Sequence, residues 1–175
     1  MSSRANLAYT PGPTSSGQVH LIAYEWLSLF TMRNAIFETP NYPMPTVLIV
    51  DDSESVRASV RALFEAEPEF TVAGEAVNGM DAINKAEELS PDLIILDLSM
   101  PIMNGLEAAE ALKSSSPSTP IYILTAHGGP EVDRAARAAG VDAVFSKGED
   151  MDAMMDKARK AFTSKNYKKK SPKLA

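Results

Sequence analysis

Acidic residues directly follow two apolar segments of the sequence. Asp51 and Asp52 come after Val47–Val50, and Asp97 comes after Leu93–Leu96. Continuous apolar runs of this length are typical of strands that are buried on both faces of a parallel sheet. A carboxylate that closes such a strand is costly to bury unless a partner compensates its charge. Asp97 taken alone is equally compatible with a turn or a helix N-cap, so its interpretation depends on the other elements.

Polar residues also end two later apolar segments. Thr125 follows Ile121–Leu124, and Ser146 and Lys147 follow Ala143–Phe145. In a parallel sheet these ends share the edge where ligands bind. Each pair of carboxylates meeting there at about 4 Å would repel by about 4 kcal/mol at an effective dielectric near 20. We therefore expect a cation, and oxygen ligands without His or Cys nearby favour Mg²⁺ or a similar hard ion.

Phosphoryl transfer is the chemistry that these groups favour. Mg²⁺ retains water ligands and binds phosphate oxygens, and Asp97 is a possible carboxylate nucleophile toward phosphorus. Lys147 would neutralise the phosphoryl oxygens, and the Thr125 hydroxyl would donate to one of them. The small side chain of Ala126 leaves room for the group.

Strand-like and helix-like segments alternate five times along the sequence. The expected strands cover residues 47–50, 70–74, 93–96, 121–124 and 143–145, and the expected helices cover 53–66, 78–89, 105–112, 132–139 and 151–162. This alternation predicts a doubly wound α/β fold with a five-stranded parallel sheet of order 2-1-3-4-5. Met151, Met154 and Met155 fall at helical spacing, and we interpret them as core residues rather than as a binding surface.

Charge is distributed unevenly along the 175 residues. The chain carries −6 overall; residues 163–175 carry +5 and residues 1–44 balance, so residues 45–162 carry −11. We expect one domain over 45–162 and a flexible basic tail over 163–175. An acidic body argues against a nucleic-acid-binding surface. Since the chain contains no cysteine, disulfides and thiolate chemistry are excluded, which fits a cytoplasmic location.

We expect residues 1–44 to form a largely disordered extension, because the first 18 residues are rich in Ser, Thr, Pro and Gly. Ile22, Trp26, Leu29 and Phe30 then fall near the spacing of a short amphipathic helix. The segment is too short and too polar to span a bilayer. It is either a docking or dimerisation helix, or else a dispensable leader or sequence upstream of the true start. The strand that begins soon after Met44 favours the second interpretation.

Four motifs in this order, VLIVDD, LIILDLSMP, YILTA and FSK, resemble the receiver domain of two-component response regulators over residues 46–162. The resemblance implies that Asp97 accepts a phosphoryl group from a phosphohistidine on a sensor histidine kinase or a histidine phosphotransfer protein, forming 4-aspartylphosphate. It also implies a signalling module that catalyses only its own phosphorylation and dephosphorylation, and that an unidentified downstream protein recognises the phosphorylated form.

The same resemblance assigns the remaining site residues. It implies Mg²⁺ ligation by Asp52, Asp97 and the main-chain carbonyl of Ser99, with Asp51 acting through a metal-bound water. Thr125 and Lys147 would both contact the phosphoryl group.

Two alternatives remain. The DLSMP motif is most similar to receivers joined to a LuxR-type helix-turn-helix domain, so the chain could be the receiver of a transcription regulator without its output domain; we expect no specific DNA binding. An aspartyl-phosphate phosphohydrolase would need a second acid where Ser99 stands. Two positions depart from the family pattern: Gly148 replaces a common proline, and Val144 replaces an aromatic switch residue. We therefore expect the loop Ala126–Pro130 to carry the signal.

Overall fold

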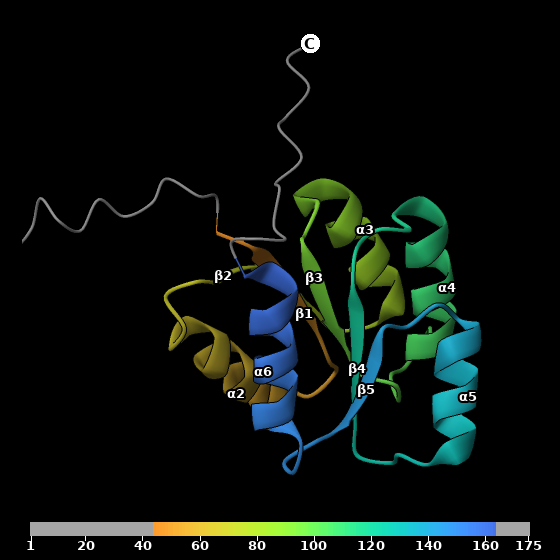
Figure 1. The fold of residues 1–175 in the computed structure, drawn as a ribbon. Helices are drawn as coiled ribbons and strands as arrows, with labels where there is room; N and C mark the ends of the chain where they lie inside the picture. The colour runs from red at the N-terminus through yellow and green to blue at the C-terminus, as the bar shows by residue number, and fades with distance from the viewer. Residues whose placement is uncertain (1–43, 164–175) are drawn as a thin grey trace, which may run out of the picture. The chain divides into compact units, whose positions relative to one another are not determined.

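Strands and helices alternate throughout residues 44–163, the part of the chain that this computed structural model describes (Figure 1). The strands are β1 (Thr46–Val50), β2 (Thr71–Ala76), β3 (Leu93–Leu96), β4 (Ile121–Thr125) and β5 (Ala143–Ser146). The helices are α2 (Glu54–Glu65), α3 (Gly79–Leu89), α4 (Gly105–Ser115), α5 (Pro130–Ala138) and α6 (Met151–Phe162). All strand pairs are parallel and their order is β2-β1-β3-β4-β5, which confirms the predicted topology.

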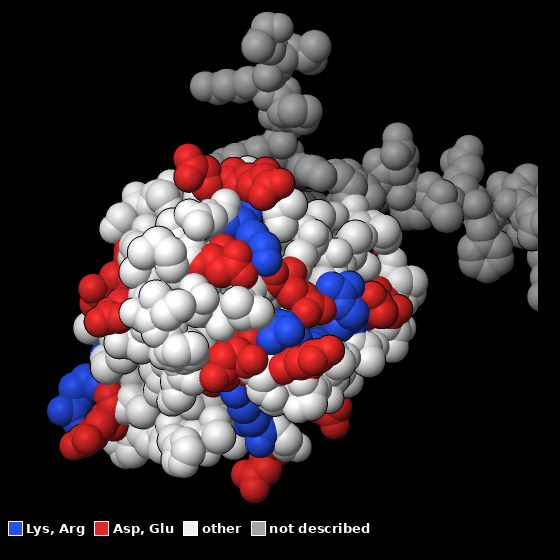
Figure 2. Space-filling view, turned by 180° about the vertical axis from the view of Figure 1, so that it is seen from behind, with Lys and Arg blue, Asp and Glu red and all other residues white. Residues whose placement is uncertain are grey.

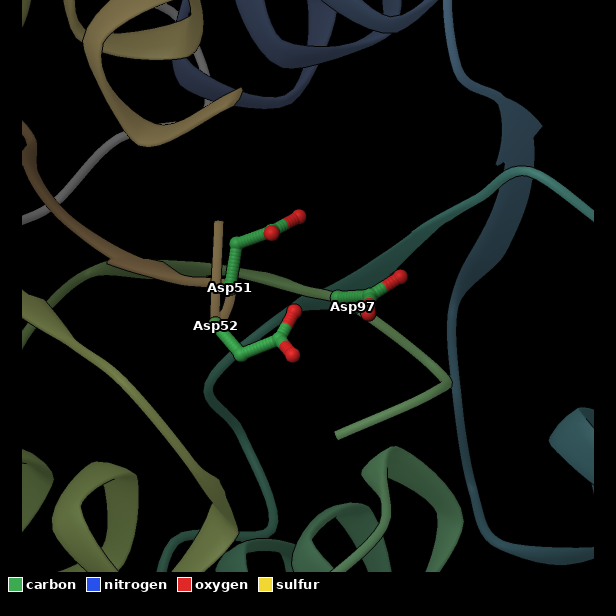
Figure 3. A group of neighbouring side chains, drawn as sticks. All are labelled: Asp51, Asp52 and Asp97. Carbon is green, nitrogen blue, oxygen red and sulfur yellow. The ribbon is translucent and has the colours of Figure 1, made fainter. Parts of the chain in front are cut away.

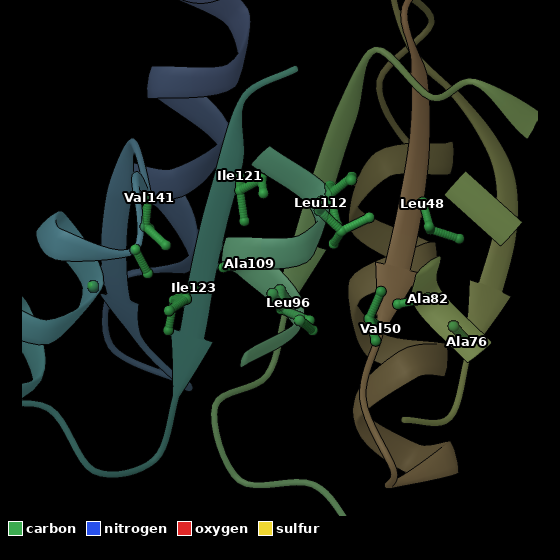
Figure 4. Packing of buried hydrophobic residues seen from close by; sticks show 14 residues of the cluster. Leu48, Val50, Ala76, Ala82, Leu96, Ala109, Leu112, Ile121, Ile123 and Val141 are labelled. Atoms are coloured by element: carbon green, nitrogen blue, oxygen red, sulfur yellow. The ribbon is translucent and has the colours of Figure 1, made fainter. Parts of the chain in front are cut away.

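Side chains of the central strands alternate between two hydrophobic cores, one on each face of the sheet. Leu48 and Val50 pack with α3, α4 and α5 (Figure 4), whereas Val47 and Ile49 pack with α2 and α6. This alternation follows from the two-residue period of a strand. Met154 and Met155 are buried in the second core, as predicted for the last helix.

The second strand differs from its prediction of residues 70–74. Phe70 precedes β2 and packs edge-on against Phe64, while Glu75 and Ala76 extend the strand. These two residues pair with the last two residues of β1, so ladder pairing with β1 carries the strand past Gly74. Glu75 therefore lies close to the carboxyl end of the sheet.

Acidic and basic side chains lie beside one another on the face shown in Figure 2. Among the described residues, ion pairs join Arg61 with Glu75 and Lys85 with Asp81. Within residues 44–163 no helix is long and apolar enough to cross a membrane. The predictions for the N-terminal extension and for the basic tail concern residues outside this range, apart from Met44 and Thr163 at its two ends.

Candidate functional site

The register of the sheet places Asp51 next to Asp97. Val50 of β1 pairs with Leu96 of β3, and each aspartate follows its strand by one residue. Asp52 adds a third carboxylate, and one oxygen from each of the three lies within 4.8 Å of the others (Figure 3). Asp51 and Asp97 are each only 3% exposed, whereas Asp52 is exposed. The predicted convergence of three carboxylates at the carboxyl edge is therefore present.

Lys147 lies between the two buried carboxylates. Its ammonium nitrogen is 2.7 Å from Asp51 Oδ2 and 2.9 Å from Asp97 Oδ1. Burial lowers the pKa of Lys147, but its two carboxylate partners outweigh that effect and leave the pKa raised. Burial raises the pKa of Asp97, and Lys147 only partly opposes this. The predicted contact of Lys147 with a phosphoryl group stays a prediction.

Main-chain N–H groups satisfy the other oxygen of each buried carboxylate. Ser53 N–H donates to Asp51 Oδ1 at 2.9 Å, and Ser99 N–H donates to Asp97 Oδ2 at 3.1 Å. Buried carboxylates require such partners because burial removes their hydration. Both side chains are consequently held in fixed orientations. The predicted ligand role of the Ser99 carbonyl stays a prediction.

Thr125 ends β4 next to these groups and is 1% exposed. Its hydroxyl oxygen accepts a hydrogen bond from His127 N–H at 3.2 Å, and its carbonyl accepts one from Lys147 N–H at 2.9 Å. After Lys147 the chain turns through Gly148, whose φ is +90°. Proline fixes φ near −65° and could not take this conformation, so the departure from the family pattern has a local structural reason.

The charge and chemistry of the site fit a hard divalent cation. Three carboxylates and one ammonium group leave a formal charge of −2. Oxygen ligands of this kind are those that Mg²⁺ prefers, and the exposed Asp52 faces solvent from which an ion would enter. The acidic group Asp51, Asp52 and Asp97 is thus a candidate magnesium site.

One site residue, Arg57 of α2, was missed by sequence analysis. Its Nη1 donates to the main-chain carbonyls of Asp51 at 2.9 Å and Asp52 at 3.4 Å, and its Nε donates to Glu75 at 2.9 Å. Its residue type and position alone say nothing of its partners. The available signal was its position in the first turns of a helix that starts directly after the acidic pair.

Comparison with known proteins assigns the class. Residues 47–159 match the response regulator receiver domain, and the chain belongs to this family.

Two relatives match this chain over part of their length. The chain is 40% identical over 107 residues to the nitrate/nitrite response regulator protein NarL of Escherichia coli, covering 61% of this chain and 50% of that protein. It is 38% identical over 104 residues to a protein-glutamate methylesterase/protein-glutamine glutaminase of Methanosarcina mazei, covering 58% of this chain and 29% of that protein. The chain therefore spans half or less of the length of these two relatives.

A solved structure supports the same assignment. The response regulator domain of Thermotoga maritima CheB has a TM-score of 0.64 and 27% sequence identity with this chain. The match covers 68% of this chain and 96% of that one.

Proposed function

We propose that residues 45–162 form a phosphorelay receiver in which Asp97 is the phosphoryl acceptor. The observation that carries this proposal is the placement of Asp97 at the carboxyl end of β3, beside a second buried carboxylate and 2.9 Å from the ammonium nitrogen of Lys147. Family membership and the acidic group support it. In this proposal residues 1–44 and 163–175 flank the receiver.

The transfer forms one O–P bond and breaks the N–P bond of a donor phosphohistidine, whose imidazole nitrogen takes the bonding electrons. An Asp97 carboxylate oxygen attacks phosphorus. Lys147 already lies 2.9 Å from Asp97, so it can remain paired with the charge of the new acyl phosphate. Thr125, at the end of the neighbouring strand, supplies a hydroxyl that can turn toward a phosphoryl oxygen. The module is a phosphoacceptor rather than a turnover enzyme.

Asp52, Asp97 and the Ser99 carbonyl would hold Mg²⁺, with Asp51 contributing through a bound water. When bound, this ion neutralises charge on the phosphoryl oxygens. Asp51 and Asp52 then serve a second purpose, since their charge disfavours any approach of the phosphoryl group that lacks a cation.

The donor in this proposal is a sensor histidine kinase or a histidine phosphotransfer protein in the cytoplasm. An unidentified downstream protein recognises the phosphorylated form. The similarity to the receiver portion of NarL supports a regulatory role of this kind. The chemistry at Asp97 is the same whichever output the receiver controls.

A small phosphodonor tests the proposal without a kinase. Incubation of the full chain with acetyl phosphate and Mg²⁺ should add one phosphoryl group per molecule, measured by intact mass, and hydroxylamine should remove it. Omission of Mg²⁺ with a chelator, or the substitution Asp97→Asn, should abolish the gain. An undiminished mass gain in Asp97→Asn would refute Asp97 as the acceptor.

A further inference from the structure

Arg57 connects the acidic loop to a neighbouring strand. Its side chain is 13% exposed and makes contacts at two ends. Nη1 donates to the carbonyls of Asp51 and Asp52, while Nε donates to Glu75 at the end of β2. A single guanidinium thus links α2, the acidic loop and β2.

The loop carbonyls need this donor because the sheet ladder ends there. Asp51 N–H still donates to Ala76 of β2, but the Asp51 carbonyl accepts from Arg57 instead of from a strand. A carbonyl bond fixes the orientation of its peptide plane. Fixing the planes after Asp51 and Asp52 limits rotation of the main chain that carries both carboxylates.

Charge pairing makes Arg57 compatible with a nearby cation. Glu75 lies 2.9 Å from Arg57 and 2.6 Å from Arg61. Burial raises the pKa of Glu75, but the hydrogen bonds from Arg61 and Arg57 outweigh it and lower the pKa, so Glu75 is ionised at neutral pH. The Glu75 carboxylate therefore offsets the guanidinium charge that would otherwise oppose metal binding.

We propose that Arg57 is the positioning residue of the metal site, holding the Asp51–Asp52 main chain so that both carboxylates stay directed at the cation. This inference rests on the proposed function, since it assumes that Mg²⁺ binds there. Arg57 donates to the Asp51 and Asp52 carbonyls and to Glu75, so it would act on the metal site through the loop. Groups that orient metal ligands from behind commonly change metal affinity by about 10- to 100-fold when they are removed.

Arg61 provides a matched control. It shares Glu75 with Arg57 and also pairs with Glu65, so its side-chain partners among the described residues are carboxylates and not loop carbonyls. Arg57→Ala and Arg61→Ala each remove an ion pair to Glu75, and only Arg57→Ala also removes the bonds to the Asp51 and Asp52 carbonyls. A difference between them isolates the carbonyl contacts.

The experiment is a Mg²⁺ titration of the full chain followed by NMR shifts of the Asp52 and Ser53 amides, with melting temperature measured in parallel. Arg57→Ala should raise the dissociation constant for Mg²⁺ about tenfold or more, and Arg61→Ala should leave it within about twofold of wild type. Arg57→Lys keeps one cationic donor and should recover part of the affinity, even if Arg57→Ala folds poorly. Unliganded amide shifts of Asp52 should already differ in Arg57→Ala.

Three results would overturn the inference. If wild type and Arg57→Ala bind Mg²⁺ equally, Arg57 does not position the site, while the proposed function survives. If Arg57→Ala and Arg61→Ala weaken binding equally, the Glu75 ion pairs are responsible rather than the loop carbonyls. If wild type itself shows no Mg²⁺-dependent shift at Asp52, the metal part of the proposed function fails together with this inference.

Discussion

Asp51 and Asp97 share one ammonium group: the Lys147 nitrogen lies 2.7 Å from the first carboxylate and 2.9 Å from the second. The two aspartates come from strands that are 46 residues apart in sequence but adjacent in the sheet. Lys147 directly follows the edge strand β5 and must reach across the end of β4 to meet them. The arrangement therefore depends on the register of four strands, and changes that disturb the ends of those strands should disturb the site.

Gly105 is the position where such a disturbance is most easily made. It begins α4, and a Cβ added there would collide with the Asp97 carbonyl oxygen and lie 2.9 Å from Leu98 Cα. Both neighbours are backbone, which cannot give way as a side chain can. We predict that Gly105→Ala lowers the free energy of unfolding by about 1–3 kcal/mol, the usual cost of overpacking, and slows phosphorylation of Asp97.

Gly128→Ala is the control for Gly105→Ala. A Cβ at Gly128 would meet nothing within 4 Å, so its unfolding free energy should change by less than about 0.5 kcal/mol. Urea unfolding of both variants measures the difference. Equal effects would mean that the close approach of α4 to the end of β3 does not constrain the fold.

Ile102 has an unfavourable backbone conformation on the surface. Its φ is +71°, its side chain is 83% exposed, and Met103 N–H donates to Pro101 O at 2.8 Å to close a three-residue turn around it. Such γ-turns with positive φ are rare and strained, especially for a β-branched residue. Ile102→Gly should raise the free energy of unfolding by about 0.5–1 kcal/mol, because strain of about 1–2 kcal/mol is released against a smaller entropy cost.

Ile102→Ala separates strain from the loss of the exposed side chain. Alanine keeps a Cβ and therefore most of the strain, so it should bring no gain. Chemical denaturation of the three proteins gives the comparison. Stabilisation by Ala as large as that by Gly would show that side-chain exposure rather than φ determines the effect.

The buried phenol of Tyr122 should make the free energy of unfolding depend on pH in the alkaline range. Burial, with a smaller contribution from the charge of Asp142, raises the pKa of Tyr122 to about 12. The folded state thus favours the protonated phenol, whose contribution to stability is complete below the unfolded pKa of about 10 and is lost as pH rises toward 12. Between pH 10 and 12, wild type should lose more unfolding free energy than Tyr122→Phe. Parallel pH profiles for the two proteins would contradict the raised pKa.

Five repeats of an apolar run with a polar end, together with the strand order usual for doubly wound sheets, predicted the order of the strands and the edge where the site lies. They also predicted that Asp51, Asp52 and Asp97 converge, since strand order and register determine which strand ends are neighbours. The predicted end of β2 was wrong, because pairing with β1 continues through Glu75 and Ala76. That outcome depends on a partner strand rather than on local sequence.

The contacts of long polar side chains could not be predicted either, because they also depend on partners that are distant in sequence. Arg57 and Arg61 are the same residue type four positions apart, yet Arg57 donates to the loop carbonyls whereas Arg61 donates to carboxylates. The difference arises from one helical turn of distance to the acidic loop. Similarly, Lys147 contacts both buried carboxylates because its side chain extends past the end of β4, and residue types alone do not specify this.

Strand β5 bears on how phosphorylation is transmitted. Val144 packs on the core shared with α3, α4 and α5, while Phe145 lies on the other face with its ring 5.7 Å from that of Tyr122. Val144 is stiff at χ1 and too short to exchange between an outer and an inner site. We predict that the loop Ala126–Pro130 and the start of α5 carry the change, because Gly128 and Gly129 have open space around them.

NMR shift mapping with a beryllofluoride phosphoryl mimic measures this change. The largest shifts outside the acidic site should fall on residues 125–134, and Val144 should keep one χ1 rotamer. A rotamer change at Val144 combined with a loop that does not shift would contradict the predicted route.

The most direct test of the central claim is to locate the phosphoryl group itself, since Asp51, Asp52 and Asp97 all lie within a few ångströms of one another. After reaction with acetyl phosphate and Mg²⁺, borohydride reduction converts an aspartyl phosphate to homoserine, which tandem mass spectrometry of peptides can place. We predict homoserine at position 97 alone, with Asp51 and Asp52 unmodified. Homoserine at position 51 or 52, or an unmodified Asp97 in a chain that has gained the phosphoryl mass, would contradict the account.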